Sequence, residues 1–184
     1  MTTRHAAFLL VAVLLPASAC PGQLTSGPQP GAKADPLPAF AVTGDKSDQS
    51  LDFVAERGGK PTVFLFVRAD RFDRPTARFI KTLDQELGQG IEGAPESGAV
   101  AVWLTEDQDQ SKGYLPRAQM SLMLEKTALA VFEGNRNGPE GWSINDAATL
   151  TAVVVRDGGV VYAAGFDSLN ETDVPKIVEA LKTP

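Results

Sequence analysis

The stretch GKPTVFLFV, residues 59–67, decides the fold that this chain is expected to adopt. Residues 62–67 form an unbroken, β-prone apolar run, which is typical of a central strand covered on both faces. Pro75 follows at a position that suits the first turn of a helix. The helix predicted over residues 75–87 has one apolar stripe, formed by Phe79, Ile80, Leu83 and Leu87. The stretch therefore predicts a strand, a loop and a helix at the centre of an α/β domain.

The segments on either side continue the alternation of strands and helices. Before the central stretch, residues 37–43 predict a short edge strand, and residues 50–57 predict a single helix ended by glycines. After it, strands are predicted over residues 99–105 and 128–132, with a weaker helix over residues 112–122 between them. Apart from the strand over residues 128–132, each of these strands is followed by a helix that can cover the sheet.

The C-terminal part predicts a hairpin and a closing helix. Strands over residues 151–156 and 160–164 flank Asp157-Gly158-Gly159, which is a strong hairpin signal. Residues 170–173 predict the start of a last helix, whose apolar residues recur at helical spacing: Val174, Ile177, Val178 and Leu181. Written without the short strand over residues 128–132, the order β-α-β-α-β-α-β-β-α predicts an α/β sandwich with a mixed sheet.

The N-terminus has the three parts of a bacterial signal peptide over residues 1–19. Arg4 gives a positive start, residues 6–15 are apolar and too few to span a bilayer, and Ala17-Ser18-Ala19 supplies small residues before the cut. The following Cys20 makes this a lipobox-like sequence, although Ala17 stands where Leu is usual. Ordinary cleavage after Ala19 is the alternative, and it would leave a free thiol on a soluble periplasmic or secreted protein. We expect lipidation of Cys20, because a lone unpaired thiol is a liability in an exported protein.

The expected location is therefore the cell envelope, with the chain exported, lipid-anchored to the membrane and facing the periplasm. Residues 20–36 are rich in proline, glycine and small polar residues without an apolar period. Such a segment cannot offset its ordering entropy, so it is predicted to be a flexible tether or an ordinary disordered terminus. The folded domain is expected over residues 37–184.

Composition limits the partners of that domain. Without residues 1–19 the chain keeps 16 Lys and Arg of the original 17 against 23 Asp and Glu, a formal net charge of −7. This acidity argues against nucleic acid, and against an anionic membrane surface, as direct partners. With 43% hydrophobic residues, the chain suits one globular domain whose core needs no disulfide.

Several motifs, in this order, resemble the thioredoxin-like superfamily, especially its exported and peroxiredoxin-like, AhpC/TSA-type branch. The central stretch at residues 59–66 resembles the family's central strand and its approach, and residues 40–43 resemble its lead-in strand. Residues 141–144 are similar to the turn before its penultimate strands, and residues 153–162 to its closing hairpin. The resemblance covers residues 37–181. It implies a three-layer sandwich with a central mixed β-sheet flanked by helices.

The resemblance also locates a redox site that this sequence has lost. Redox-active relatives carry their cysteines where this chain has Arg71, Phe72, Asp73 and Arg74. A helix N-terminus at that position lowers a thiol pKa, which makes the thiolate available. The resemblance implies that the family's cis-proline, which faces those cysteines, falls near Thr149 and Leu150, and neither residue is proline. Thiol chemistry is therefore not expected, unless Cys20 could serve from outside the domain.

Arginines gather at the vacated site. Arg68, Arg71, Arg74 and Arg78 lie on or just after the loop at the expected helix N-terminus, where they could bind an anion or an acidic partner. The alternative is that Arg71 and Arg74 are solvated and paired with the neighbouring Asp70 and Asp73.

Metal binding is not expected. Only oxygen ligands are available in the mature chain, and residues 133–138 imitate a calcium loop whose twelfth position is Ile144 instead of Glu. Glu106, Asp107 and Asp109 form a second acidic cluster, which we also interpret as a polar loop. No cofactor is expected. Trp142, beside glycines, is expected to be partly exposed.

Two hypotheses of function follow. In the first, the chain is a non-catalytic, redox-inactive thioredoxin-like domain of a cell-envelope lipoprotein, which binds or scaffolds an extracytoplasmic protein partner. In the second, it is a thioredoxin- or peroxiredoxin-type oxidoreductase that acts in cell redox homeostasis.

Overall fold

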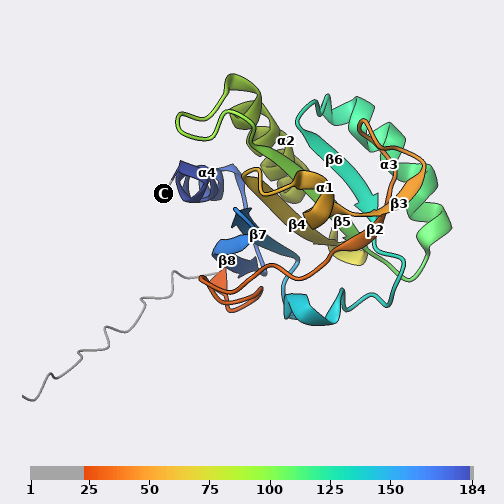
Figure 1. Cartoon of the computed structure of the whole chain (residues 1–184). Helices are drawn as coiled ribbons and strands as arrows, with labels where there is room; N and C mark the ends of the chain where they lie inside the picture. The colour runs from red at the N-terminus through yellow and green to blue at the C-terminus, as the bar shows by residue number, and fades with distance from the viewer. Residues whose placement is uncertain (1–22, 183–184) are drawn as a thin grey trace, which may run out of the picture.

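The computed structural model describes residues 23–182 and shows an eight-stranded mixed sheet with the order β1-β8-β7-β4-β5-β6-β2-β3 (Figure 1). Strand β4 is parallel to β5, and β5 is parallel to β6, whereas the other neighbouring pairs are antiparallel. The strands are β1 Gln23–Leu24, β2 Pro38–Ala41, β3 Gln49–Asp52, β4 Thr62–Arg68, β5 Gly98–Leu104, β6 Thr127–Val131, β7 Leu150–Arg156 and β8 Gly159–Phe166. The helices are α1 Phe53–Arg57, α2 Arg74–Gln89, α3 Gln108–Leu122 and α4 Val174–Lys182, and three short 3-10 turns are η1 Ala69–Arg71, η2 Glu140–Trp142 and η3 Glu171–Asp173.

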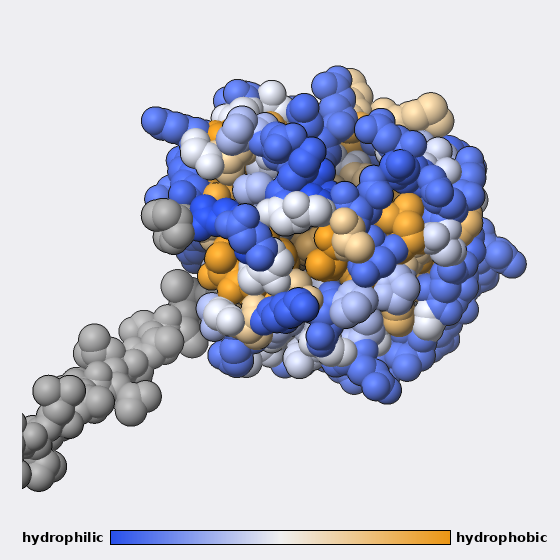
Figure 2. All heavy atoms as spheres, in the orientation of Figure 1, coloured by the Kyte–Doolittle hydropathy of each residue, from blue (hydrophilic) through white to orange (hydrophobic). Residues whose placement is uncertain are grey.

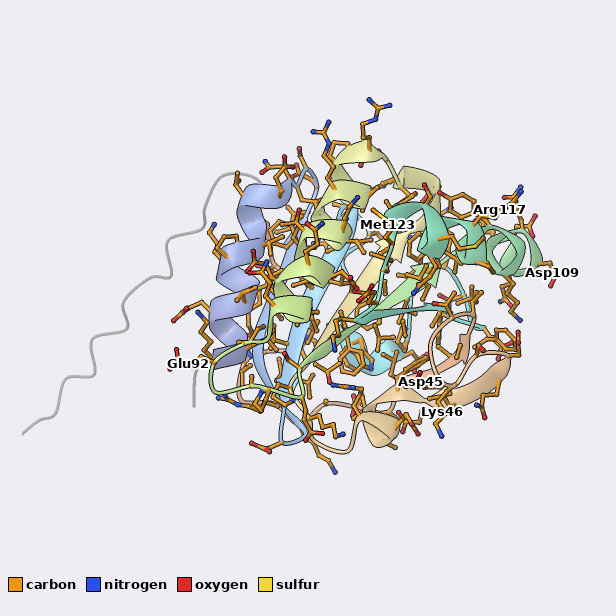
Figure 3. All side chains as sticks on the ribbon, turned by 90° about the horizontal axis from the view of Figure 1, so that it is seen from above. Asp45, Lys46, Glu92, Asp109, Arg117 and Met123 are labelled. Atoms are coloured by element: carbon orange, nitrogen blue, oxygen red, sulfur yellow. The ribbon has the colours of Figure 1, made fainter. Side chains whose placement is uncertain are left out.

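The central strand β4 is buried along its whole length and separates two cores. Alternate side chains Val63, Leu65 and Val67 pack under α2, α3 and α4, which share one face of the sheet. Phe64 and Phe66 point to the other face, which α1, η2 and residues 24–37 cover. Figure 3 looks onto the face of the sheet that α2, α3 and α4 cover, with these helices in front of the strands. The predicted three-layer α/β sandwich with a mixed sheet is confirmed.

The face that carries α1 is shown in space-filling form in Figure 2, where apolar residues form a band inside a polar surround. Leu51 and Val54 are partly buried on this face and pack against the second core. The covering layer is thin here, because α1 is a helix of five residues.

Residues at the two ends of helix α2 explain where it begins and ends. The carboxylate of Asp73 accepts a hydrogen bond from Thr76 N at 2.9 Å, and Pro75 occupies the first turn. The helix ends before Gly90, whose φ of 83° suits a residue without a Cβ. Its apolar stripe is buried as predicted, so the helix expected over residues 75–87 is confirmed with slightly wider bounds.

The closing hairpin and helix are also confirmed. Asp157 and Gly158 link β7 to β8 with φ of 51° and 75°, the backbone that a tight hairpin turn requires. Asn170 forms a capping box with Asp173 ahead of α4. The hairpin turn and the capping box each depend only on residues that are close together in the chain, so both could be predicted from the sequence.

Two predictions between residues 37 and 57 are wrong. Residues 50–57 are not one helix: Asp52 ends β3 and accepts hydrogen bonds from Val54 N and Ala55 N, so that it caps the shorter α1. The strand predicted over residues 37–43 is not at the edge, because β2 pairs with β6 on one side and β3 on the other. Tertiary pairing with β2 turns residues 49–52 into the edge strand instead.

The predicted flexible tether is also wrong for residues 23–36. Strand β1 pairs with β8, the Ser26 and Thr151 hydroxyls are 2.7 Å apart, and Ala34 N donates to Gly158 O at 2.9 Å. Gly27 makes the close approach possible, since a Cβ there would lie 2.7 Å from Ala163 Cβ. The segment is held by the sheet and the second core and needs no apolar period of its own.

The predicted signal peptide, residues 1–19, and the predicted lipidation site, Cys20, lie outside the described residues. Within residues 23–182, no helix has the length and apolarity needed to cross a membrane.

Candidate functional site

The structure brings two segments together: residues 71–74, which we call the degenerate redox positions because the resemblance expects redox cysteines there, and residues 147–149, beside the expected cis-proline position. The loop after β4 lies beside residues 147–149, where Arg68 N donates to Thr149 O at 3.1 Å and Arg71 Nη1 donates to Ala147 O at 2.8 Å. Thr149 is fixed on its other side by its own N–H, which donates to Phe166 O at 2.7 Å. All peptide bonds of residues 23–182 are trans. The two segments that the resemblance paired thus meet at one end of the sheet.

At the helix start where the resemblance expects a redox-active thiol, this chain has the carboxylate of Asp73. Arg71 is exposed, Phe72 is half-buried, Asp73 is the N-cap of α2, and Arg74 is the first residue of that helix. Asp73 Oδ1 accepts from both Thr76 N and Thr76 Oγ1, at 2.9 and 2.7 Å. The carboxylate therefore uses the helix N-terminus that would otherwise stabilise a thiolate. Residues 23–182 contain no cysteine and no histidine.

Arg68 does not belong to a surface anion site, which corrects one part of the prediction. Its side chain is only 3% exposed and points into the end of the second core. One guanidinium nitrogen donates to Arg136 O at 3.2 Å, and another donates to the exposed carboxylate of Asp146. Arg68 Nε is buried and has no hydrogen-bond partner among the described residues. Arg68 therefore fastens the long loop between β6 and β7 onto the sheet.

The other three arginines are exposed, but they are not paired as the alternative expected. Asp70 pairs with Arg136 at 3.1 Å, and Asp73 caps α2. Within residues 23–182, Arg74 and Arg78 form no ion pair. Cations without acidic partners therefore remain along the first turns of α2.

Arg136 is held by two carboxylates close to this end of the sheet. It donates to Glu106 Oε1 at 3.0 Å and to Asp70 Oδ2 at 3.1 Å. The hydrogen bond to Glu106 and the charge of Asp70 raise the pKa of Arg136 above its ordinary value. The acidic residues beside the vacated site are thus partly neutralised by an arginine that the sequence reasoning did not select.

A groove lies between the first turns of α2 and the second half of α3, and we call it the α2–α3 groove. Its volume is about 710 Å³. Its lining residues come from the degenerate redox positions, α2 and α3: Phe72, Asp73, Arg74, Ala77, Tyr114, Arg117, Ala118, Ser121 and Leu122. Figure 3 labels Arg117 on α3. The sequence contained no sign that Tyr114 and Arg117 face the start of α2, because that pairing depends on how two helices pack.

The two acidic motifs serve protein contacts. Glu133 accepts from Ser50 Oγ at 2.6 Å and from Lys112 Nζ at 3.0 Å, while Asn135 Oδ1 accepts from Asn137 N at 2.8 Å. Asp107 caps α3 through Gln110 N at 2.9 Å. Among residues 23–182, no three His, Cys, Asp or Glu side chains are grouped so that they could hold a metal ion.

Glu133 gives a test of the contacts in this region. The hydrogen bond from Ser50, and then that from Lys112, lower the pKa of Glu133 below the ordinary value of a glutamate. The stabilisation is therefore present above the unfolded pKa and is lost as the pH falls through the lower folded pKa. Carboxyl-carbon NMR should show Glu133 titrating below that ordinary value. In Lys112→Gln the pKa should move back toward it, and an unshifted Glu133 in the native protein would contradict the contacts.

The expectation that Trp142 is partly exposed is wrong. Its side chain is 0% exposed, lies 5.3 Å from Phe64 and 5.0 Å from Phe66 between ring centroids, and donates through Nε1 to Pro36 O at 3.3 Å. At the adjacent Gly141, a Cβ would collide with the carboxylate of Asp35 as it now lies. The glycine next to Trp142 therefore indicates a close approach between segments.

No protein-family model and no curated protein matches the chain. Solved structures do match. The thioredoxin domain of a thiol-disulfide oxidoreductase from Bacteroides vulgatus is 12% identical with a TM-score of 0.60, and the match covers 84% of this chain and 99% of that one. A secreted disulfide oxidoreductase from Mycobacterium tuberculosis is 16% identical with a TM-score of 0.52, with coverage of 78% and 95%. An exposed lipoprotein thioredoxin from Streptococcus pneumoniae is 10% identical with a TM-score of 0.55, with coverage of 79% and 98%.

Identities this low establish the fold and nothing finer. The matched structures extend over nearly the whole folded part of the chain, in agreement with the sheet order and the two covering layers. The chain therefore has the thioredoxin-like fold of the disulfide oxidoreductases, with Arg71, Phe72, Asp73 and Arg74 at the positions where the resemblance places redox cysteines.

Proposed function

We propose that this chain is a redox-inactive thioredoxin-like domain of a cell-envelope lipoprotein and acts as a binding or scaffolding module for an extracytoplasmic partner. Two of the matched structures are described as secreted or as an exposed lipoprotein, which supports an extracytoplasmic location. The signal-like residues 1–19 and the lipobox-like position of Cys20 support the same location.

The observation that carries the proposal is the Asp73 cap. Thiol–disulfide exchange and peroxide reduction by this fold both need a thiolate. At the start of α2 the Thr76 N–H already donates to the Asp73 carboxylate, and residues 23–182 contain no sulfhydryl group. Binding a partner needs no nucleophile, so a domain of this fold can keep a binding surface after it has lost its redox-active residues.

The position of β1 argues against a catalytic role for Cys20. Gln23 is aligned with Phe166, then Leu150 and then Val67 across three strand spacings, which is about 14 Å at the usual separation. Cys20 is three residues before Gln23, and three extended residues reach only about 10 Å. Its sulfur would therefore not reach the end of β4 while β1 stays paired.

Turnover assays test the proposal. Neither the full chain nor its Cys20→Ser variant should accelerate insulin reduction by dithiothreitol or consume hydrogen peroxide with a thiol reductant, because neither has a nucleophile at α2. Activity in the full chain that disappears in Cys20→Ser would establish the oxidoreductase alternative. Activity that persists in Cys20→Ser would also overturn the proposal, since it would show catalysis without a thiol.

A further inference from the structure

The α2–α3 groove combines an apolar floor with positively charged walls. Tyr114 is 40% exposed although it is large and aromatic, and Phe72 and Leu122 are half-buried beside it. An open groove of about 710 Å³ is in the size range of ligand sites, which run from about 300 to 1,000 Å³. It can therefore take an aromatic side chain together with its chain neighbours.

The apolar floor of the groove is held in place by the core that lies under α2, α3 and α4. The Phe72 ring lies 5.1 Å from the ring of the buried Trp103 on β5, and 6.4 Å from the ring of Tyr114 on α3. Tilted and edge-on contacts of this kind favour fixed ring positions. Because the rings are already ordered, a partner that packs on them loses little entropy from the protein side.

The walls have cations without acidic partners. Arg74 is contributed by α2 and Arg117 by α3, both are exposed, and neither forms an ion pair within residues 23–182. Asp73 is the one acidic residue of the lining, and its carboxylate is engaged in the α2 cap. The groove is thus locally positive on a chain of net charge −6, which favours an acidic occupant.

We infer that the α2–α3 groove binds an extended acidic polypeptide segment in which an aromatic side chain stands between carboxylates. The aromatic side chain packs on Phe72 and Tyr114, and the flanking carboxylates face Arg74 and Arg117. This inference rests on the proposed function as a binding module and names the surface and the partner class. It also replaces Arg68, which is buried, by Arg117 on α3 as a member of the binding surface.

The probe for this inference is a fluorescein-labelled peptide of four Glu-Phe repeats, titrated with the full-length Cys20→Ser protein and followed by fluorescence anisotropy. Peptides of four Gln-Phe and four Glu-Gly repeats report the charged and aromatic contributions separately. We expect the Glu-Phe peptide to bind more tightly than both, with an affinity that falls as salt is added.

Three variants locate the binding. Arg74→Glu combined with Arg117→Glu should lower the affinity for the Glu-Phe peptide roughly tenfold or more and reduce the salt dependence of that affinity. Tyr114→Ser should reduce the preference for Glu-Phe over Glu-Gly while the salt dependence stays. The matched control, Lys33→Glu combined with Lys126→Glu, makes the same charge change at exposed residues outside the groove and should leave binding within about twofold. Circular dichroism and thermal unfolding establish that each variant is folded.

The outcomes separate this inference from the proposed function. Equal loss in the control pair would show a general charge effect, and absence of Glu-Phe binding at millimolar peptide would overturn the groove as a peptide site. Vesicles of phosphatidylglycerol form a further arm: vesicle binding that depends on Arg74 and Arg117, without peptide binding, would assign the groove to a lipid surface and overturn the inference. None of these results restores turnover, so the redox-inactive proposal stands or fails on its own assays.

Discussion

Replacing Cys20 with serine should move the protein from the membrane fraction to the soluble fraction of the envelope. Lipidation joins the cysteine sulfur through a thioether to a diacylglyceryl group, and its two acyl chains give stable anchoring where one chain gives only marginal binding. Serine has no sulfur to accept the lipid, and residues 23–182 contain no helix that could span the membrane in its place. Fractionation with immunoblotting, together with metabolic labelling by a palmitate analogue, measures both effects in the same cells.

A neighbouring substitution provides the control. Pro21→Ser leaves the thiol and the preceding Ala17-Ser18-Ala19 unchanged, so this variant should remain labelled and membrane-bound. If Cys20→Ser partitions like the native protein, or if the native protein is already soluble, Cys20 is not the anchor. Ordinary cleavage after Ala19 would then be the better interpretation.

Anchoring at Cys20 would also place the domain close to the bilayer. Gln23 is already part of the sheet, so only three residue steps separate Cys20 from β1. Those steps cover at most about 10 Å. A long tether over residues 20–36 would have allowed a much greater distance, and that prediction failed because residues 23–36 pack on β8 and the second core.

The parts of the fold that were predicted have local causes. The run at residues 62–67, the Asp73 and Pro75 start of α2, and the Asp157-Gly158 turn each act within a few residues of chain. The errors have distant causes. Residues 49–52 become a strand because β2 is available for pairing, and Trp142 becomes buried because residues 34–37 cover it.

The candidate site shows the same division. The resemblance was enough to predict that the loop after β4 meets the segment around Thr149, and it does so through Arg71, which donates to Ala147 O, and Arg68 N, which donates to Thr149 O. The burial of Arg68 was not predictable, because it depends on a long loop that folds back over the end of β4. The contribution of α3 to the groove was missed for the same reason, since helix-to-helix packing leaves no short motif.

Trp142→Ala should destabilise the folded protein by about 3–5 kcal/mol, the usual cost of removing a buried aromatic side chain. The substitution empties the space against Phe64 and Phe66 and removes the hydrogen bond to Pro36 O. Domains are typically stable by only about 5–15 kcal/mol, so a large part of the stability would be lost. Urea unfolding followed by circular dichroism measures the change.

Trp142→Phe is the matched variant, because it keeps a ring against Phe64 and Phe66 but has no N–H to donate to Pro36 O. It should cost clearly less than Trp142→Ala. Since Trp142 lies under residues 34–37, the alanine variant should also be cut first by proteases within residues 24–37. A cost below about 1 kcal/mol for Trp142→Ala would fit an exposed tryptophan instead. Such a result would show that residues 34–37 do not pack on Trp142.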